Sequence, residues 1–300
     1  MSDWLISIEG TEAGHILAIS LALMSAILHA VFGALQKGRF DPWLTRGATD
    51  ISYGLIILPF ALFAVPFPEP HIWPILGGAF LIHTAYKILQ AQAYTKGAYT
   101  VVYPVVRGTG PLITVLAVGV VFSEHYTIGQ WSGVLILSGG ILGLAIFNLS
   151  HETIQRSTLF TALFLAFLTG VMVAAYTTYD AYGIRATPNP FTFLAWFYVI
   201  DAVAMPLIAA LRWHRMETPP QLGALMRRGF VGGIIAIASF GGIMLATRLD
   251  KVGQAAVLRE TSVLFAALIG WLFLREAVGV KRAALMGLIA LGAVLVEFGR

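Results

Sequence analysis

Ten long apolar stretches, separated by short polar connections, constrain this chain more than any other feature. Each stretch has about the 20 residues that an α-helix needs to cross a bilayer. Only 11% of the residues are charged, against roughly 25% in soluble domains. We therefore predict an all-α integral membrane protein, and its ten transmembrane helices are expected at residues 15–37, 44–65, 72–94, 98–122, 128–148, 158–182, 191–211, 229–248, 252–274 and 279–298.

One motif occurs twice, half a chain apart. Arg107 follows two valines and precedes Glu124 by seventeen residues, and Arg259 precedes Glu276 by the same number. A polar stretch at 150–158 separates the halves, so we predict two five-helix repeats at residues 1–150 and 151–300. Because five is odd, the second repeat begins on the opposite side of the membrane, and the repeats are inverted, as in many secondary transporters.

The basic residues predict an orientation. The odd-numbered connections and helix ends carry twelve of them, against four on the other side. The twelve are Lys37, Arg39, Arg46, Lys96, Arg156, Arg212, Arg215, Arg227, Arg228, Arg275, Lys281 and Arg282, and the four are Arg185, Arg248, Lys251 and Arg300. This bias places the odd connections in the cytoplasm and both termini outside.

Composition also bounds the partners. The net charge of +4 comes mostly from residues between the spans, which fits membrane orientation and not nucleic-acid binding. The chain has no cysteine, so it has no disulfide framework and no cysteine-based metal site or nucleophile. The acidic first fourteen residues lack the basic region of a cleavable signal peptide. We expect a small-molecule substrate, the lipid bilayer as surroundings, and no cofactor or metal.

The two arginines are the leading candidates for binding a substrate. A guanidinium inside a membrane span is costly and usually faces the bundle interior or a wet cavity. Tyr99, Tyr103 and Arg107 recur every four residues and so share one helix face. Pro104 and Pro111 interrupt backbone pairing nearby, which resembles the discontinuous helices of transporter sites. The alternative is a kinked packing helix with a structural arginine.

In the second repeat, Arg259 and Glu260 are neighbours that point about 100° apart on a helix. One of them must therefore find a partner on another helix or in a ligand. The two arginines either bridge one long anion or hold the anion in alternate access states.

Other polar residues lie inside the predicted spans. Lys87, His29, Tyr176 and Glu260 are further candidates for lining the substrate site. Asp50, Asp180, Asp201 and His83 are candidates for proton transfer or gating. The alternative is that these groups neutralise one another, with Asp50, Asp201 or Glu260 paired with Lys87 or an arginine, because buried charges nearly always need pairing.

The stretch from Ala93 to Pro111, which contains Tyr103-Pro104-Val105-Val106-Arg107-Gly108, is similar to the third and fourth helices of EamA-type carriers of the drug/metabolite transporter superfamily. The stretch from Leu258 to Glu276 is similar to their ninth helix, and the ten-helix duplicated layout extends the resemblance over nearly the whole chain. The resemblance implies a multi-pass carrier of the bacterial inner membrane with a central cavity between the halves. It also implies cytoplasmic termini, opposite to the charge count. Substrate, direction, coupling ion and a monomeric or homodimeric state stay open.

Three functions compete. The first is alternating-access transport of a small anionic or zwitterionic metabolite, such as an amino acid, phosphonate or organic acid, coupled to a proton or another ion. The second is efflux of cationic compounds, which is disfavoured because the first helix has no Asp or Glu between His15 and Gln36. The third is an intramembrane enzyme, for which no catalytic set is found: His151-Glu152 lacks the second histidine of a zinc protease.

Overall fold

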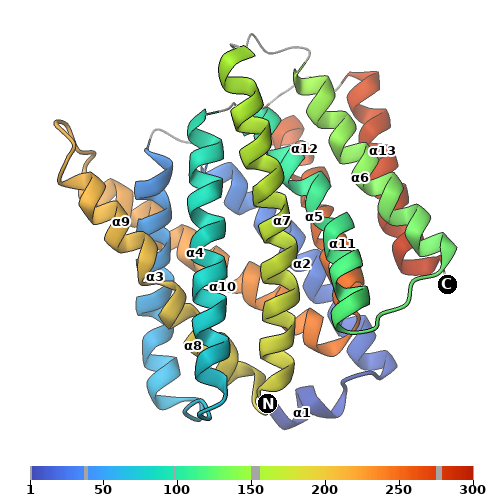
Figure 1. Ribbon diagram of the computed structural model, residues 1–300, viewed down its shortest axis with the longest axis horizontal. Helices are drawn as coiled ribbons and strands as arrows, with labels where there is room; N and C mark the ends of the chain where they lie inside the picture. Colours follow the sequence, from blue (N-terminus) through green and yellow to red (C-terminus); the bar gives the residue numbers. More distant parts are fainter. Residues whose placement is uncertain (1, 37–39, 97–98, 150–155, 275–278, 300) are drawn as a thin grey trace.

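The computed structural model describes residues 2–36, 40–96, 99–149, 156–274 and 279–299 as a helical bundle (Figure 1). Lys37, Arg39, Arg275, Glu276 and Arg300, which the sequence analysis used, lie outside these residues. The helices are α1 (Ser2–Ser7), α2 (Glu12–Gln36), α3 (Pro42–Phe63), α4 (Ile72–Lys96), α5 (Tyr99–Val121), α6 (Ile128–Leu149), α7 (Arg156–Ala186), α8 (Pro190–Asp201), α9 (Ala204–Trp213), α10 (Leu222–Leu249), α11 (Val252–Glu260), α12 (Ser262–Leu274) and α13 (Val280–Phe298).

Eight helical segments of the described chain are long and apolar enough to cross a membrane. One of them, Pro190–Trp213, joins α8 and α9, and another, Val252–Ile269, begins with α11 and runs into α12. The predicted spans at 44–65 and 279–298 do not meet this standard. The first corresponds to α3, which carries Arg46 and Asp50, and the second to α13, whose apolar part, Ala283–Phe298, is short.

Two predicted helices are interrupted. The expected helix at 191–211 is divided at Ala202 and Val203. Pro206 follows four residues after Ala202 and has no N–H for the Ala202 carbonyl, which explains a break at that point. The expected helix at 252–274 is divided at Thr261, whose N–H and hydroxyl both turn back to the Leu258 carbonyl.

The helix with two prolines, α5, is not interrupted as predicted. Pro104 and Pro111 predicted a region like a discontinuous helix, but α5 runs without interruption from Tyr99 to Val121. An interruption lies instead between α11 and α12 in the second half of the chain, where no proline is present. The Thr261 side chain competes there with the helical hydrogen bonds.

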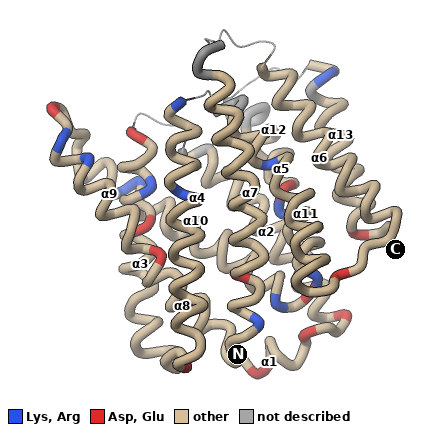
Figure 2. Tube along the Cα trace, in the orientation of Figure 1, with Lys and Arg blue, Asp and Glu red and all other residues tan. Residues whose placement is uncertain are grey.

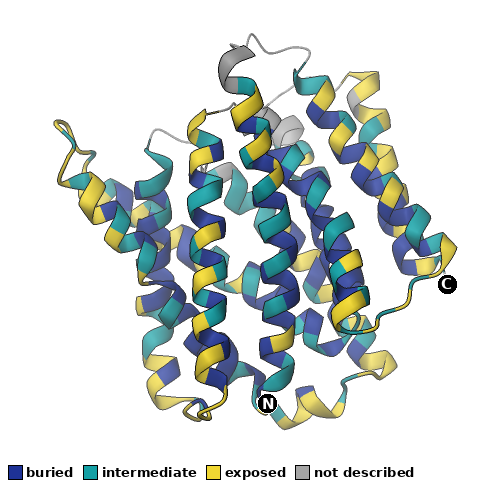
Figure 3. Cartoon of the chain, in the orientation of Figure 1, coloured by how far each residue is buried: buried dark blue, intermediate teal, exposed yellow. Residues whose placement is uncertain are grey.

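The packing of the bundle joins the two halves of the chain. The most extensive contacts pair α13 with α6, α10 with α2 and α3, and α7 with α5 and α4. Glycines allow the closest approaches: a Cβ added at Gly292 of α13 would lie 2.5 Å from the Leu137 nitrogen of α6. Small residues of this kind are typical of helix interfaces in membranes, where packing replaces hydrophobic burial as the driving force. Figure 3 shows the buried positions on the facing sides of these helices and exposed positions on their outer sides.

The two ends of the bundle are held by different ion pairs. At one end, Arg248 binds Glu9 with 2.5 Å between Nε and Oε1, and Gly10 N–H donates to the Leu249 carbonyl, so the N-terminal segment is fixed beside the end of α10. Gly299, the last residue that the structure describes, lies at the same end, where its carbonyl accepts a hydrogen bond from Thr127. At the other end, Arg212 lies 3.2 Å from Asp41. Both termini therefore lie at the same end of the bundle.

Candidate functional site

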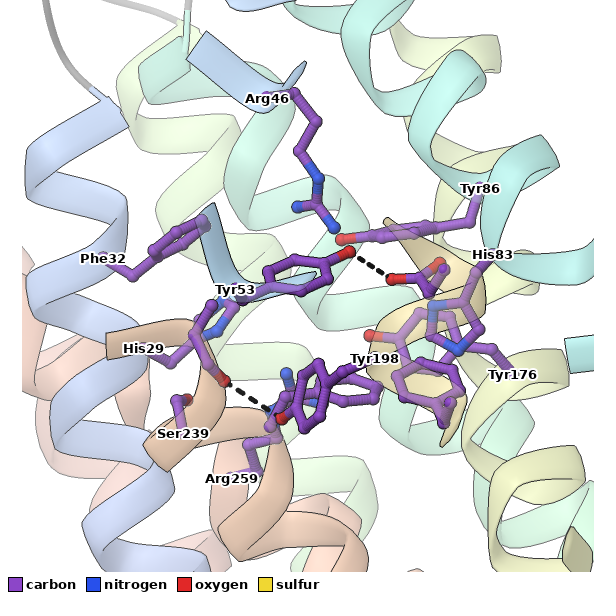
Figure 4. Close-up of a pocket in the computed structure, with 14 residues that line it drawn as sticks. His29, Phe32, Arg46, Tyr53, His83, Tyr86, Tyr176, Tyr198, Ser239 and Arg259 are labelled. Atoms are coloured by element: carbon purple, nitrogen blue, oxygen red, sulfur yellow. Dashed lines mark hydrogen bonds between the residues drawn. The ribbon is translucent and has the colours of Figure 1, made fainter. Parts of the chain in front are cut away.

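Two adjoining pockets lie inside the bundle, and they share His29, Phe32, Arg46 and Tyr86 in their walls. Each has a volume of about 50 Å3, which is room for about three to five water molecules. The first is shown in Figure 4 and extends to Arg259, His83 and Asp201. The second extends along α4 to Gln90 and reaches Pro42 at the start of α3. The second pocket therefore points toward the end of the bundle opposite the termini.

The wall of the first pocket is mostly aromatic. Tyr176 lies 4.6 Å from the His83 ring and 5.8 Å from Phe240, measured between ring centroids. Phe197 and Phe240 are stacked, with centroids 5.6 Å apart. Tyr53 and Tyr198 meet edge to face, and Tyr198 also contacts Phe197. Both tyrosines line the pocket (Figure 4). Such walls supply large rigid surfaces together with a few hydroxyl groups that orient a ligand.

Arg259 is a buried cation in the wall of this pocket, and its charge is not neutralised by an ion pair with any described residue. Its relative exposure is 5%, and its guanidinium carbon lies 5.2 Å from the centre of the Phe240 ring. Of the buried lysine and arginine side chains in the described residues, Arg259 alone makes no ion pair. Its Nε has no hydrogen-bond partner in the protein. A guanidinium has five N–H donors and cannot lose its charge in a protein, so these donors are available to a ligand or to water.

The local fold explains the position of Arg259. The residue lies in the last turn of α11, immediately before the break at Thr261. The C-terminal end of a helix carries partial negative charge, which stabilises a nearby cation. A short helix that ends in the middle of the bundle therefore holds a positive charge at the pocket, and the neighbouring Glu260 pairs with Arg107 instead of with Arg259.

Arg107 has a different environment. Its Nη1 lies 3.0 Å from Glu260 Oε1, its Nη2 contacts the His29 ring, and its guanidinium lies over the Tyr103 ring at 5.4 Å. Arg107 is 2% exposed and is not among the residues that line the two pockets. Glu260 thus points toward α5 while its neighbour Arg259 points into the pocket, as their angular separation on a helix requires.

A second group of charges surrounds Lys87, which is 1% exposed. Its Nζ lies 2.6 Å from Asp50 and 2.7 Å from Asp201, and the Tyr53 hydroxyl donates to Asp201 at 2.5 Å. Arg46 completes the group with Nε 3.0 Å from Asp50. Two cations and two carboxylates therefore neutralise each other beside the pockets, which is the ion-pairing alternative raised for Asp50 and Asp201.

The remaining predicted residues are also placed by the structure. His83 and Asp180 form a buried pair with 2.8 Å between Nε2 and Oδ2, and His83 lines the first pocket. Tyr176 lines the same pocket, Tyr103 lines the second, and His29 lines both. The Tyr99 side chain lies outside the described residues.

Several lining residues were not identified from the sequence. Arg46 was counted with a connection, whereas it lies in α3 and lines both pockets. Its spacing of four residues from Asp50 was the available signal, since such pairs meet on a helix face. Tyr53, Tyr198 and Phe240 carry no signal of this kind, because aromatic residues are frequent throughout the spans. In the described part of the chain, no group of three or more His, Asp or Glu side chains has the arrangement of a metal site.

Comparisons with known proteins agree with this architecture. Residues 160–298 match the EamA-like transporter family. A crystal structure of another protein superposes with a TM-score of 0.75 over 96% of this chain and 99% of that one, at 17% sequence identity, which shows a shared fold. No curated protein matches the sequence.

Proposed function

This chain is a member of the drug/metabolite transporter superfamily through its EamA-like C-terminal half, and on that premise we propose that it is a secondary active transporter for a small anionic or zwitterionic metabolite. The substrate would bind in the central pockets and reach the two sides of the membrane by alternating access. Amino acids, phosphonates and organic acids are the candidate substrates. A multi-pass position in the bacterial inner membrane, as a monomer or homodimer, belongs to the same proposal.

The observation that carries this proposal is the free guanidinium of Arg259. A buried cation without a counter-charge is costly, so it is retained where a ligand supplies the negative charge. A guanidinium fork binds carboxylate or phosphoryl oxygens with two parallel hydrogen bonds. The small volume of the pockets favours a compact ligand over a large drug.

The opposite side of the first pocket supports a zwitterion. Asp201 lines this pocket together with the faces of several aromatic rings. An ammonium group is attracted both by a carboxylate and by the electron-rich face of an aromatic ring. Lys87 and Tyr53 bind Asp201 through Oδ2, but its Oδ1 has no hydrogen-bond partner among the described residues. A ligand with an acidic group toward Arg259 and an amino group toward Asp201 Oδ1 would match both.

Arg107 and Glu260 would have different partners in the other access state of the carrier. In this conformation their ion pair is closed. If Glu260 releases Arg107, the second guanidinium becomes available, and the two arginines would bind the substrate alternately. His29, which contacts Arg107 and lines both pockets, is then placed to respond to that change. Proton coupling through Asp50, Asp180, Asp201 or His83 remains part of the proposal.

The packing pattern supports ten spans in two inverted repeats. Exchange of the helices of the first half with those of the second in chain order converts the α2–α10 contact into the α7–α4 contact. The same exchange converts α3–α10 into the contact between α8 and α4, and returns the α6–α13 contact to itself. A twofold axis in the membrane plane has this effect on contacts.

The test is ligand binding to the purified protein. A thermal-shift screen of amino acids, phosphonates, organic phosphates and dicarboxylates identifies a stabilising ligand, because a ligand stabilises the state that it binds. We expect Arg259→Ala to weaken the binding of that ligand by about tenfold to a hundredfold, the usual effect of losing a charged hydrogen bond. Arg212→Ala is the control, since Arg212 is an exposed arginine at the end of the bundle. Normal binding and transport by both Arg107→Ala and Arg259→Ala would refute the assignment.

Efflux of cationic compounds is the second candidate, favoured by the aromatic wall and by Asp201 at the pocket. A drug-resistance assay with lipophilic cations separates the two functions. Resistance that depends on Asp201 and not on Arg259 would support the efflux function instead.

A further inference from the structure

A groove on the outside of the bundle has no role in the proposed transport. After the break at Ala202 and Val203, α9 packs against α3 at one side of the bundle, and its C-terminal end projects outward (Figure 1). A groove of about 310 Å3 lies between α9, α3 and α10, compared with about 50 Å3 for each central pocket. This volume lies at the lower end of the roughly 300–1,000 Å3 typical of ligand sites.

The groove is lined by apolar side chains. Leu44 and Ile51 come from α3, Pro206 and Ala210 from α9, and Leu225 from α10. The one ionisable residue in the lining is His214, which lies just beyond the end of α9. Because α9 belongs to a segment that is long and apolar enough to cross a membrane, we expect this apolar groove to face the hydrocarbon of the bilayer. The bilayer supplies acyl chains, and an acyl chain is an apolar group that can occupy such a groove.

Basic residues surround the end of the groove near His214. Arg215 follows His214, and Arg227 follows the lining residue Met226; both are exposed. Figure 2 shows basic positions at this end of α9, with one acidic position, Glu217, in the loop that follows. Arg212, also at this end, is paired with Asp41. Arginine side chains at the membrane surface attract anionic headgroups.

We propose that this groove is a binding site for an anionic phospholipid. One acyl chain lies along α9 between α3 and α10, and the headgroup phosphate is bound by Arg215 and Arg227. The lipid contacts α3 at Leu44 and Ile51, on the helix that carries Arg46 and Asp50 to the central pockets. The bound lipid would therefore contact the same helix that lines the central pockets.

The experiment measures lipid binding to the full-length protein in detergent by native mass spectrometry, with phosphatidylglycerol and phosphatidylcholine as probes. We expect the wild type to retain phosphatidylglycerol in preference to phosphatidylcholine. The double variant Arg215→Gln/Arg227→Gln should bind phosphatidylglycerol about tenfold more weakly, because each arginine near the surface contributes to headgroup attraction. Ala210→Phe fills the groove from an exposed position and should weaken both lipids.

Two controls isolate the site. Lys96→Gln/Lys281→Gln removes two exposed lysines elsewhere on the bundle, and Leu207→Phe adds a ring to α9 outside the groove lining. Both should bind lipid like the wild type. Ala210→Leu replaces Ala210→Phe if the larger ring prevents folding. Equal binding of the two lipids by the wild type, or no effect of either groove variant, overturns the proposal. A homodimer that dissociates with Ala210→Phe also overturns it, since the occupant is then a second copy.

Discussion

At the scale of single residues, the main feature is how the buried charges are distributed. Lys87 and Arg107 each have carboxylate partners, whereas Arg259 has none among the described residues. Paired charges inside a bundle contribute mostly to specificity of packing, since desolvation offsets much of their attraction. The difference in pairing, and not the presence of arginine as such, separates the proposed binding residue from the structural ones.

The ion pair between Arg107 and Glu260 gives a stability prediction. Both side chains are nearly inaccessible, at 2% and 4% exposure. Glu260→Gln leaves a buried guanidinium without its counter-charge, so we expect a loss of about 3–5 kcal/mol in the free energy of unfolding. The double variant Arg107→Met/Glu260→Leu should lose much less, because no isolated charge remains. Thermal unfolding in detergent measures both, and equal losses in the two variants would contradict a close pair.

At the scale of helices, the space beside each glycine determines whether a larger side chain is tolerated at that position. A Cβ at Gly292 would approach the backbone of α6 at 2.5 Å, whereas a Cβ at Gly287, on the same helix, meets nothing within 4 Å. Gly292→Ala should therefore destabilise the protein by about 1–3 kcal/mol through overpacking. Gly287→Ala should be neutral or stabilise it by up to about 1 kcal/mol, since alanine favours a helix. The two unfolding temperatures, measured side by side, should move in opposite directions or differ clearly.

The helices also show what the sequence could predict. Hydropathy located the helical segments, because apolar runs of span length leave few other structures in a membrane. It did not locate the breaks at Ala202 and Thr261, which depend on the N–H that Pro206 lacks and on the hydroxyl of Thr261. Pro104 and Pro111 predicted an interruption in α5, because proline removes a helical hydrogen bond, yet α5 is continuous.

For the site, the sequence identified charged residues but not their partners. The repeat singled out Arg107 and Arg259 as equivalent, while the structure pairs one and leaves the other facing a pocket. That difference arises from the direction in which each helix face points and from the position of Glu260 on α11. The sequence repeat contains neither kind of information. Arg46 was missed because a charge near the end of a predicted span is easily assigned to the connection.

At the scale of the whole molecule, the proposed transport requires the two halves to move against each other. Ser25 of α2 and Ser239 of α10 lie across this boundary, with 3.4 Å between their hydroxyl oxygens. The chain has no cysteine of its own, so a Ser25→Cys/Ser239→Cys variant contains a single possible disulfide. Serine and cysteine are similar in shape, and the separation is close to disulfide reach. We expect oxidation to stop transport and reduction to restore it. Because Ser239 also lines the first pocket, substrate binding to each single variant is the control for a direct effect on the site. Full transport by the oxidised double variant would show that this boundary is static.

The aromatic wall of the pockets has a spectroscopic consequence. The residues that line the two pockets include tyrosine and phenylalanine but no tryptophan. Trp43 lies under the guanidinium of Arg212, and Trp131 lies on α6, both away from the pocket walls. A change in indole emission on addition of a substrate would therefore report rearrangement of the helices and not direct quenching by the bound molecule.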